Sequence, residues 1–324
     1  MDYDETSHGQ RTYYNKMSRY ERKKMNSKWT TTSIAGRVID LNESSNGSII
    51  GGKSFTAVAI NCAAKAGEWI MTKLGGYSKL ELKYSAHDLV TEVDKGSERL
   101  IRNLIGTHFP HHSFLGEEGV EPGPEASSRA LAEMSDAEYL WIVDPIDGTT
   151  NFVHGFPFFC VSIALAYQGE VIVGVIYDPC KDELFVAEKG KGAYVHGKKM
   201  SVSGEETLRG SLIATGLPAD HHYALPLNLK GIQSVAPEVR NLRIAGSAAI
   251  HLAYVAAGRL SGFWEIGLSS WDIAAGALLV QESGGLVTDT HGRPYNLAVR
   301  NIAATNGLVH AELLDKLAGA EAVG

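Results

Sequence analysis

Acidic side chains stand at the ends of apolar stretches in three separate parts of the sequence. Glu117 and Glu118 follow the run HSFLG, Asp144 and Asp147 belong to the segment DPIDGTT, and Asp272 precedes the run IAAGALLV. Carboxylates that converge in one site repel one another unless a cation lies between them. A hard divalent cation with oxygen ligands suits such a site, and Mg²⁺ also keeps coordination positions open for water and phosphate. We therefore expect a magnesium site.

The segment DPIDGTT predicts how two of these carboxylates are aimed. Asp144 ends an apolar run over 139–144, and Pro145, which has no N–H to donate, is expected to interrupt the sheet there. A turn at this point directs Asp144 and Asp147 into one space, with the carbonyl of Ile146 between them. Gly148 then lets backbone N–H groups approach an anion closely, so a phosphate site is expected beside the metal site.

Each piece alone also has a structural explanation. A DxxD pattern is common in turns and helix caps, and the pair GEE carries little information. Asp272 has the position of an N-cap residue, and Glu265 is compatible with a solvent-exposed strand end. The joint presence of these acids at the edges of apolar elements favours the chemical interpretation.

The elements that position these residues follow from periodicity and turn residues. Helical spacing predicts helices over 55–74, 94–108, 247–258 and 272–285. Strand patterns predict a strand over 139–144, a hairpin of 159–168 with 170–179 around Gly169, further antiparallel strands over 183–200, and a strand over 259–266. The first half therefore has an α+β pattern and the second half an α/β pattern.

The composition shift near residue 54 suggests three parts. Residues 1–53 contain few aliphatic side chains and are expected to form a flexible extension; a basic arm around residues 19–24 is the alternative interpretation. We expect a metal- and phosphate-binding half over 54–205 and a substrate-binding half over 206–324.

Overall composition restricts the class of protein. The 324 residues are 44% hydrophobic and 21% charged, which is typical of a soluble globular protein, and the net charge of -7 argues against a large basic nucleic-acid surface. The three cysteines are scattered and suggest neither a zinc site nor a disulfide framework. No run approaches the length of a membrane span, and the first residues do not resemble a signal peptide. We expect a cytoplasmic protein that does not associate with membranes.

The motifs together resemble the inositol monophosphatase family over residues 54–310. DPIDGTTNF at 144–152 and WDIAAGALLVQESGG at 271–285 resemble its two signatures, and DLVTEVD at 88–94, FLGEE at 114–118 and GSAA at 246–249 resemble its intervening motifs in the same order. One departure is Ala86-His87 before Asp88, where proline often precedes in the family.

The resemblance implies a role for each matching residue. It implies that the magnesium ligands are Glu117, Asp144, Asp147, Asp272 and the carbonyl oxygen of Ile146. It implies that the catalytic residues are Asp94, Thr149 and Glu117, with Asp94 and Thr149 orienting and activating the attacking water. It implies that the substrate meets Gly148, Thr149, Gly246, Ser247, Ala248, Glu265 and Lys83.

The resemblance also implies a fold, a reaction and partners. The fold is a layered αβαβα sandwich of the sugar-phosphatase type, and the reaction is magnesium-dependent, lithium-sensitive hydrolysis of inositol monophosphate or another small phosphorylated polyol by a homodimer. Relatives that hydrolyse sugar bisphosphates, histidinol phosphate or nucleotide 3′-phosphates are alternatives, although the run TTNF favours the inositol type. Bacterial relatives also act in transcription complexes, so a binding partner of transcription factors or nucleic acid stays a second kind of hypothesis.

Overall fold

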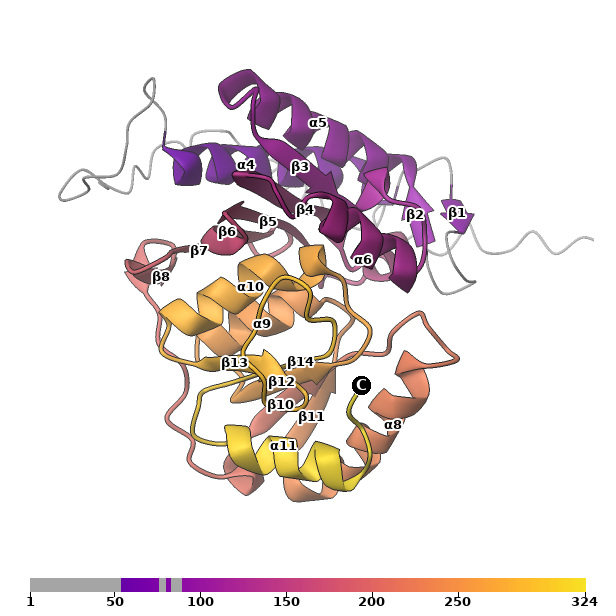
Figure 1. The fold of residues 1–324 in the computed structure, drawn as a ribbon, viewed down its shortest axis with the longest axis vertical. Coiled ribbons are helices and arrows are strands. Elements are labelled where there is room, and N and C mark those ends of the chain that lie inside the picture. The colour runs from indigo at the N-terminus through magenta and orange to yellow at the C-terminus, as the bar shows by residue number, and fades with distance from the viewer. Residues whose placement is uncertain (1–53, 76–79, 83–88) are drawn as a thin grey trace, which may run out of the picture. The chain divides into compact units, whose positions relative to one another are not determined.

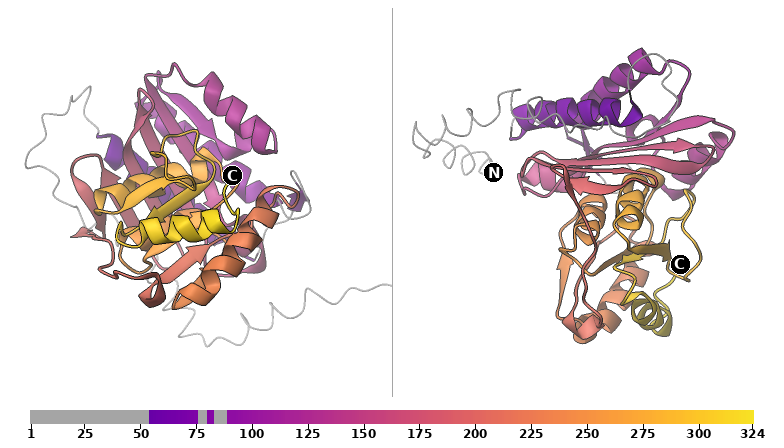
Figure 2. Two further views of the ribbon diagram at one scale, coloured as in Figure 1. Left: turned by 60° about the horizontal axis from the view of Figure 1, so that its bottom comes forward. Right: turned by 90° about the vertical axis from the view of Figure 1, so that its left-hand side faces the viewer.

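Helices and sheets alternate in five layers in the computed structural model, which describes residues 54–75, 80–82 and 89–324 (Figures 1 and 2). The first layer contains α4 (Phe55–Lys73) and α5 (Glu92–His108), which pack on a seven-stranded sheet. Below this sheet lie α9 (Ala248–Ala256) and α10 (Ser270–Glu282), then a five-stranded sheet, and then α8 (Ala224–Val235) and α11 (His310–Gly319). The expected αβαβα sandwich is confirmed.

Side-chain caps fix where the first two helices begin. Ser54 caps α4 by accepting a hydrogen bond from the backbone N–H of Ala57, at 3.0 Å. Helix α5 begins two residues earlier than the spacing predicted, because Thr91 caps it and Asp94 accepts a hydrogen bond from the Thr91 N–H, at 2.8 Å. The short strands β1 (Leu80–Leu82) and β2 (Leu89–Thr91) pair antiparallel just before this cap.

The seven-stranded sheet has the order β3-β4-β5-β6-β7-β8-β9. Its strands are β3 (Ser113–Gly116), β4 (Tyr139–Asp147), β5 (Cys160–Tyr167), β6 (Glu170–Asp178), β7 (Glu183–Glu188), β8 (Gly192–Val195) and β9 (Lys198–Lys199). Of the described pairs in this sheet, only that of β3 with β4 is parallel. The predicted hairpin is confirmed: Gln168 and Gly169 both have positive φ, as a two-residue hairpin turn requires.

Strand β4 corrects one expectation. Pro145 does not end the pairing, because β4 continues to Asp147 opposite Cys160. Its register with β5 shifts between Asp144 and Asp147. Such a bulge leaves residues out of the ladder, which accommodates the missing N–H of Pro145 and changes the direction of the side chains that follow.

The five-stranded sheet is mixed, with the order β11-β10-β12-β14-β13. Its strands are β10 (Leu212–Thr215), β11 (Asn241–Ile244), β12 (Gly262–Glu265), β13 (Leu286–Asp289) and β14 (Ile302–Thr305). Strand β10 pairs in parallel with β11 and β12, and β14 pairs antiparallel with β12 and β13. The remaining elements are α6 (Pro124–Glu133), α7 (Thr149–His154) and the 3₁₀ turns η1 (Glu117–Gly119), η2 (Leu208–Gly210) and η3 (Ala236–Glu238).

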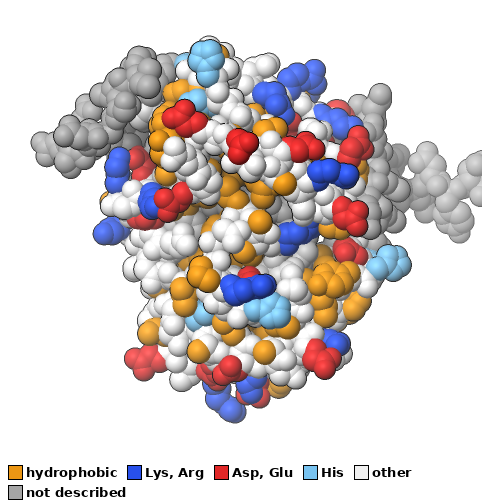
Figure 3. All heavy atoms as spheres, in the orientation of Figure 1, with side chains coloured by type: hydrophobic (Ala, Val, Ile, Leu, Met, Phe, Trp, Pro, Cys, Tyr) orange, Lys and Arg blue, Asp and Glu red, His pale blue; other side chains and the backbone are white. Residues whose placement is uncertain are grey.

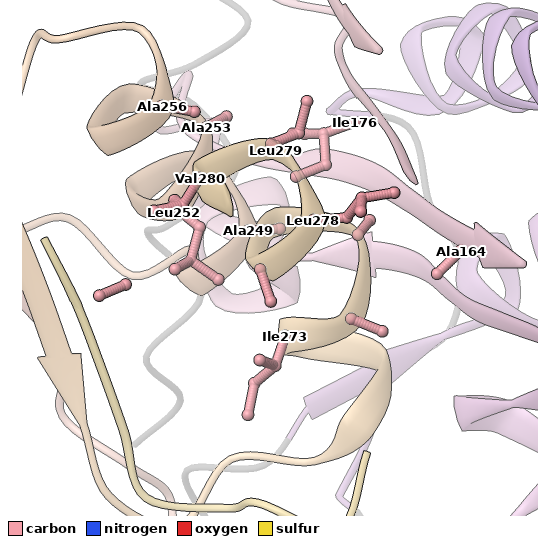
Figure 4. Close-up of a cluster of buried hydrophobic side chains, with 14 of the residues drawn as sticks. Ala164, Ile176, Ala249, Leu252, Ala253, Ala256, Ile273, Leu278, Leu279 and Val280 are labelled. Atoms are coloured by element: carbon pink, nitrogen blue, oxygen red, sulfur yellow. The ribbon is translucent and has the colours of Figure 1, made fainter. Parts of the chain in front are cut away.

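The main core lies between the two sheets. Aliphatic side chains of α9 and α10, among them Leu252, Ile273 and Leu278, meet Ala164 of β5 and Ile176 of β6 (Figure 4). A second cluster buries Trp264 of β12 against Leu313 and Leu317 of α11. Both faces of α10 are covered, and it therefore has an apolar surface nearly all round.

The described residues cover only two of the three expected parts of the chain. Residues 1–53 lie outside the described residues, and so does the extension predicted there. The boundary expected between 205 and 206 stays a prediction; α10, from the second part, packs on the sheet of the first. No helix of the described residues combines the length and apolar character of a membrane span.

Candidate metal and phosphate site

Three carboxylates converge where β4 ends and α10 begins. Oxygen atoms of Asp144, Asp147 and Asp272 lie within 4.8 Å of one another. Asp272 is the third residue of α10 and accepts a hydrogen bond from the Ser269 N–H, at 2.6 Å. The N-cap residue is therefore Ser269, and the interpretation of Asp272 as the N-cap is wrong by three positions.

The cluster is electrostatically unfavourable without a cation. Burial, together with the charge of Glu117 and of the other acids, raises the pKa of Asp144 well above its usual range. Burial also raises the pKa of Asp147 to about 6 and that of Asp272 to about 8. No lysine or arginine in the described part of the chain forms an ion pair with any of the three. The donor set, which is all oxygen, therefore fits a hard divalent cation.

Glu117 lies beside this cluster on η1. Its charge contributes to the raised pKa of Asp144 and of Asp94. The buried carboxylate of Glu98 on α5 holds the turn, because its Oε2 accepts the Glu118 N–H at 2.7 Å. Glu98 therefore fixes the position of the turn that carries Glu117, although Glu98 itself does not line the cavity.

Asp94 and Thr149 are joined directly. The Thr149 hydroxyl lies 3.0 Å from Asp94 Oδ1 and 3.1 Å from the carbonyl oxygen of Ile146. Asp94 is fully buried, and burial raises its pKa although Thr91 and Thr149 oppose the shift by hydrogen bonding. A hydroxyl that donates to a carboxylate keeps its lone pairs available for a water molecule.

The backbone passes closely at Gly148, between β4 and α7. Its φ is +102°, and a Cβ there would lie 3.0 Å from the Phe158 carbonyl oxygen and 3.1 Å from that of Gly246. Only glycine avoids strain at this φ. The backbone at Gly148 therefore packs closely against Gly246, in the turn that precedes α9.

Helix α9 is attached to the same carboxylate cluster. Asp147 Oδ2 accepts hydrogen bonds from the Ser247 hydroxyl, at 2.6 Å, and from the Ala249 N–H, at 2.7 Å. The Asn151 amide donates to the carbonyl oxygens of Phe158 and Ala245, both at 2.7 Å. These bonds place the GSAA segment beside the first residues of α7.

Glu265 ends β12 inside the site. It is only 7% exposed, so the alternative of a solvent-exposed strand end is wrong. Burial, together with the charges of Asp272 and Asp147, raises its pKa well above the usual range. Its carboxylate covers Gly216, where a Cβ would lie 2.1 Å from Oε2. The side chain is therefore closely confined.

These residues line one cavity of about 310 Å³. Of the expected site residues, the cavity walls include Glu117, Asp147, Gly148, Thr149, Gly246, Ser247, Ala248, Glu265 and Asp272. Asp94, Asp144 and Ile146 support these walls through the contacts above. Lys83 lies outside the described residues. Charged and apolar side chains are interspersed over the face seen in Figure 3.

Four residues that the sequence interpretation missed contribute to this site: Glu98, Asn151, Gly216 and Arg300. Glu98 had a signal, since it lies four residues after Asp94 on the same face of the helix. Asn151 lies within the TTNF run. Gly216 and Arg300 carry no local pattern, because their contacts join distant segments.

Comparisons with known proteins agree with one another. Residues 53–321 match the model of the Inositol monophosphatase family. The chain is 46% identical to Inositol monophosphatase 2 of Solanum lycopersicum, over 78% of this chain and 94% of that protein. It is 42% identical to Nus factor SuhB of Pseudomonas aeruginosa, over 77% and 90%. The solved structure of an IMPase from Thermotoga maritima superposes with a TM-score of 0.73 at 35% identity, covering 82% of this chain and 97% of that one.

Proposed function

This chain belongs to the inositol monophosphatase family and is a phosphoric monoester hydrolase, and on that premise we propose that its preferred substrate is inositol monophosphate and its cofactor Mg²⁺. The observation that carries the proposal is the convergence of Asp144, Asp147 and Asp272 within 4.8 Å, beside the turn at Gly148.

The metal part of the proposal rests on the ligand chemistry. Glu117, Asp144, Asp147, Asp272 and the carbonyl oxygen of Ile146 would hold magnesium. The single hydrogen of the Thr149 hydroxyl can be donated to Asp94 or to the Ile146 carbonyl oxygen, and donation to Asp94 leaves the lone pairs of the Ile146 carbonyl for the cation. Bound there, magnesium supplies charge neutralisation at the phosphoryl oxygens and lowers the pKa of a water.

The protein's own groups then orient the attacking water. The Thr149 hydroxyl donates to Asp94, and its free lone pair accepts a hydrogen bond from the water, which attacks phosphorus in line with the leaving alcohol. Asp94 takes the proton, a role that suits a buried carboxylate with a raised pKa. The N–H groups of Gly148 and Thr149 bind the phosphate, and positioning supplies most of the rate enhancement.

The proposal about the substrate is supported by the cavity wall around Glu265. Glu265, with Gly246, Ser247 and Ala248, faces the place where the alcohol part of the substrate would lie. A carboxylate there accepts hydrogen bonds from hydroxyl groups and repels a second phosphate. This favours an inositol monophosphate over sugar bisphosphates and nucleotide 3′-phosphates, and the uncharged TTNF run also argues against the nucleotide type.

The proposal is tested by phosphate release from a panel of monoesters, assayed with and without Mg²⁺. We expect the highest kcat/KM for inositol monophosphate and no turnover after chelation of divalent cations. Preference for a bisphosphate, or full activity in a chelator, would refute the substrate or the cofactor respectively.

Three further properties belong to the same proposal. We expect lithium to inhibit at millimolar concentration while sodium does not, since an occupant of one magnesium position blocks the reaction. We expect a homodimer, which sedimentation equilibrium measures. A cytoplasmic location is supported by the three cysteines, all of which are unpaired.

The name of the Pseudomonas aeruginosa relative supports a second candidate function, as a partner in transcription complexes. This function does not need turnover. A variant without phosphatase activity, such as Asp147→Asn, would then still bind transcription factors in a pull-down, whereas a purely metabolic enzyme would bind none.

A further inference from the structure

Arg300 joins two walls of the cavity. It lies on the segment before β14, and its Nη1 donates to the Pro124 carbonyl oxygen and to the Ser127 hydroxyl, the latter at 2.7 Å. Both acceptors lie in the first turn of α6. Its Nη2 donates in the other direction, to the Gly267 carbonyl oxygen at 3.1 Å. One guanidinium therefore connects α6 to the loop after β12.

The backbone of the same residue strengthens the second contact. The Arg300 carbonyl oxygen accepts the N–H groups of Gly267, at 3.1 Å, and Leu268, at 2.9 Å. This loop runs from Glu265, at the alcohol wall, to Asp272, in the carboxylate cluster. Its position therefore affects the wall that the substrate alcohol meets.

The hydrogen bonds of Arg300 depend on the directions of its guanidinium N–H groups more than on its positive charge. All its described acceptors are neutral, and no carboxylate in the described ranges forms an ion pair with it. Donors on one planar group that point to two walls are a property of the guanidinium fork, which an ammonium group lacks. Lysine at this position keeps the charge and loses the connection.

We propose that Arg300 is a positioning residue for substrate selection, which fixes α6 and the Gly267 loop at the distance that lets Glu265 and its neighbours contact a polyol. The inference rests on the proposed function, because it needs a substrate whose alcohol part meets this wall. A small aryl phosphate makes few contacts there and depends mainly on the carboxylate cluster.

The test compares Arg300→Lys and Arg300→Gln on two substrates, inositol monophosphate and 4-nitrophenyl phosphate. Both variants are expected to raise KM for inositol monophosphate about tenfold, the scale of one lost hydrogen bond to a charged group. Their kcat for the aryl phosphate and their magnesium activation are expected to stay within about twofold of wild type. Arg240→Gln is the matched control, because this exposed arginine donates to Gly210 away from the cavity.

A second variant covers the possibility that Arg300 substitutions do not fold. Ser127→Ala removes one acceptor and leaves the guanidinium in place, so a smaller rise in the same KM is expected. Combined with Arg300→Gln it should add nothing, because the Arg300 substitution already removes the contact with the Ser127 hydroxyl.

Three results would overturn the inference: equal losses on both substrates, a wild-type KM in the lysine variant, or an unchanged KM in Ser127→Ala where Arg300 variants are unfolded. Failure of the proposed function is distinguishable, because then the wild-type protein itself would not hydrolyse inositol monophosphate.

Discussion

At the scale of single residues, the candidate site depends on carboxylates in unusual surroundings. Asp94 and Glu265 are both buried, and burial is the main cause that raises the pKa of each. Their contacts differ: Asp94 accepts a hydrogen bond from the Thr149 hydroxyl, whereas Glu265 lines the cavity and covers Gly216. Similar groups therefore have different proposed roles, one toward the water and one toward the alcohol.

Replacing Glu265 by alanine should affect the alcohol selectively. Loss of a charged hydrogen-bond acceptor costs about 1.5–3 kcal/mol, so kcat/KM for inositol monophosphate is expected to fall roughly ten- to a hundred-fold. An aryl phosphate should lose much less. Steady-state kinetics on both substrates measure the ratio, and equal losses would mean that Glu265 supports the site as a whole.

Gly216→Ala offers a matched change that keeps the Glu265 charge. The new Cβ would lie 2.1 Å from Glu265 Oε2, so the carboxylate must move. We expect the same substrate-selective loss as in Glu265→Ala. Wild-type selectivity in this variant would show that the exact place of the carboxylate is unimportant.

At the scale of elements, two helix starts hold carboxylates of the candidate site. Asp94 and Asp272 are both third residues of their helices, and both close a capping box, with Thr91 and Ser269. The cap fixes each carboxylate through one oxygen and leaves the other for the site. A capping role and the proposed chemical role are therefore compatible in the same side chain, although the sequence presents them as alternatives.

The turn η1 depends on α5 in a way that can be measured. Glu98→Ala removes the acceptor of the Glu118 N–H and frees the turn that carries Glu117. We expect about tenfold more magnesium to be needed for half-maximal activity, on the scale of one lost charged hydrogen bond. Arg102→Ala is the control: it removes only the half-exposed partner of Glu98 and should change little. An unchanged magnesium requirement in Glu98→Ala would remove Glu98 from the account.

Local pattern predicted the helices α4, α5, α9 and α10, the strands β4 to β9 and β12, and the acids at the ends of these elements. It did not predict the helices α6, α8 and α11 or the strands β10, β11, β13 and β14. The helix over 55–74 and the hairpin around Gly169 were found because periodicity and turn residues are local properties. The bulge at Pro145 was missed, since one residue without an N–H is compatible with either an end or a shift of register. Arg300 could not be found, because its partner Ser127 is 173 positions away in the sequence.

At the scale of the whole molecule, the layer between the two sheets ties the site to stability. Helices α9 and α10 form the core and also begin at the site. His251 of α9 is 1% exposed and packs between Phe158 and Phe263, and neither ring nitrogen has a hydrogen-bond partner among the described residues. Burial lowers its pKa to about 4.

This histidine should make the protein sensitive to acid. Below pH 6.5 the unfolded chain binds the proton and the folded chain does not, so stability falls as the pH drops toward 4. From pH 7 to pH 5 the loss due to His251 is expected to be about 2 kcal/mol. Urea unfolding of His251→Leu should lack this part of the pH dependence, whereas the exposed control His291→Leu should keep it. Identical pH dependence in all three proteins would contradict the assignment.

Asp147→Asn tests whether the carboxylate cluster binds the metal that hydrolysis needs. The asparagine carbonyl oxygen can still accept the Ser247 hydroxyl and the Ala249 N–H, so α9 should stay in place and the melting temperature should change little. The measurement is phosphate release from inositol monophosphate across a magnesium titration, for wild type and variant. We expect a loss of at least about a hundred-fold at every magnesium concentration, because a charged ligand is gone. Near-normal magnesium-dependent turnover in the folded variant would contradict it.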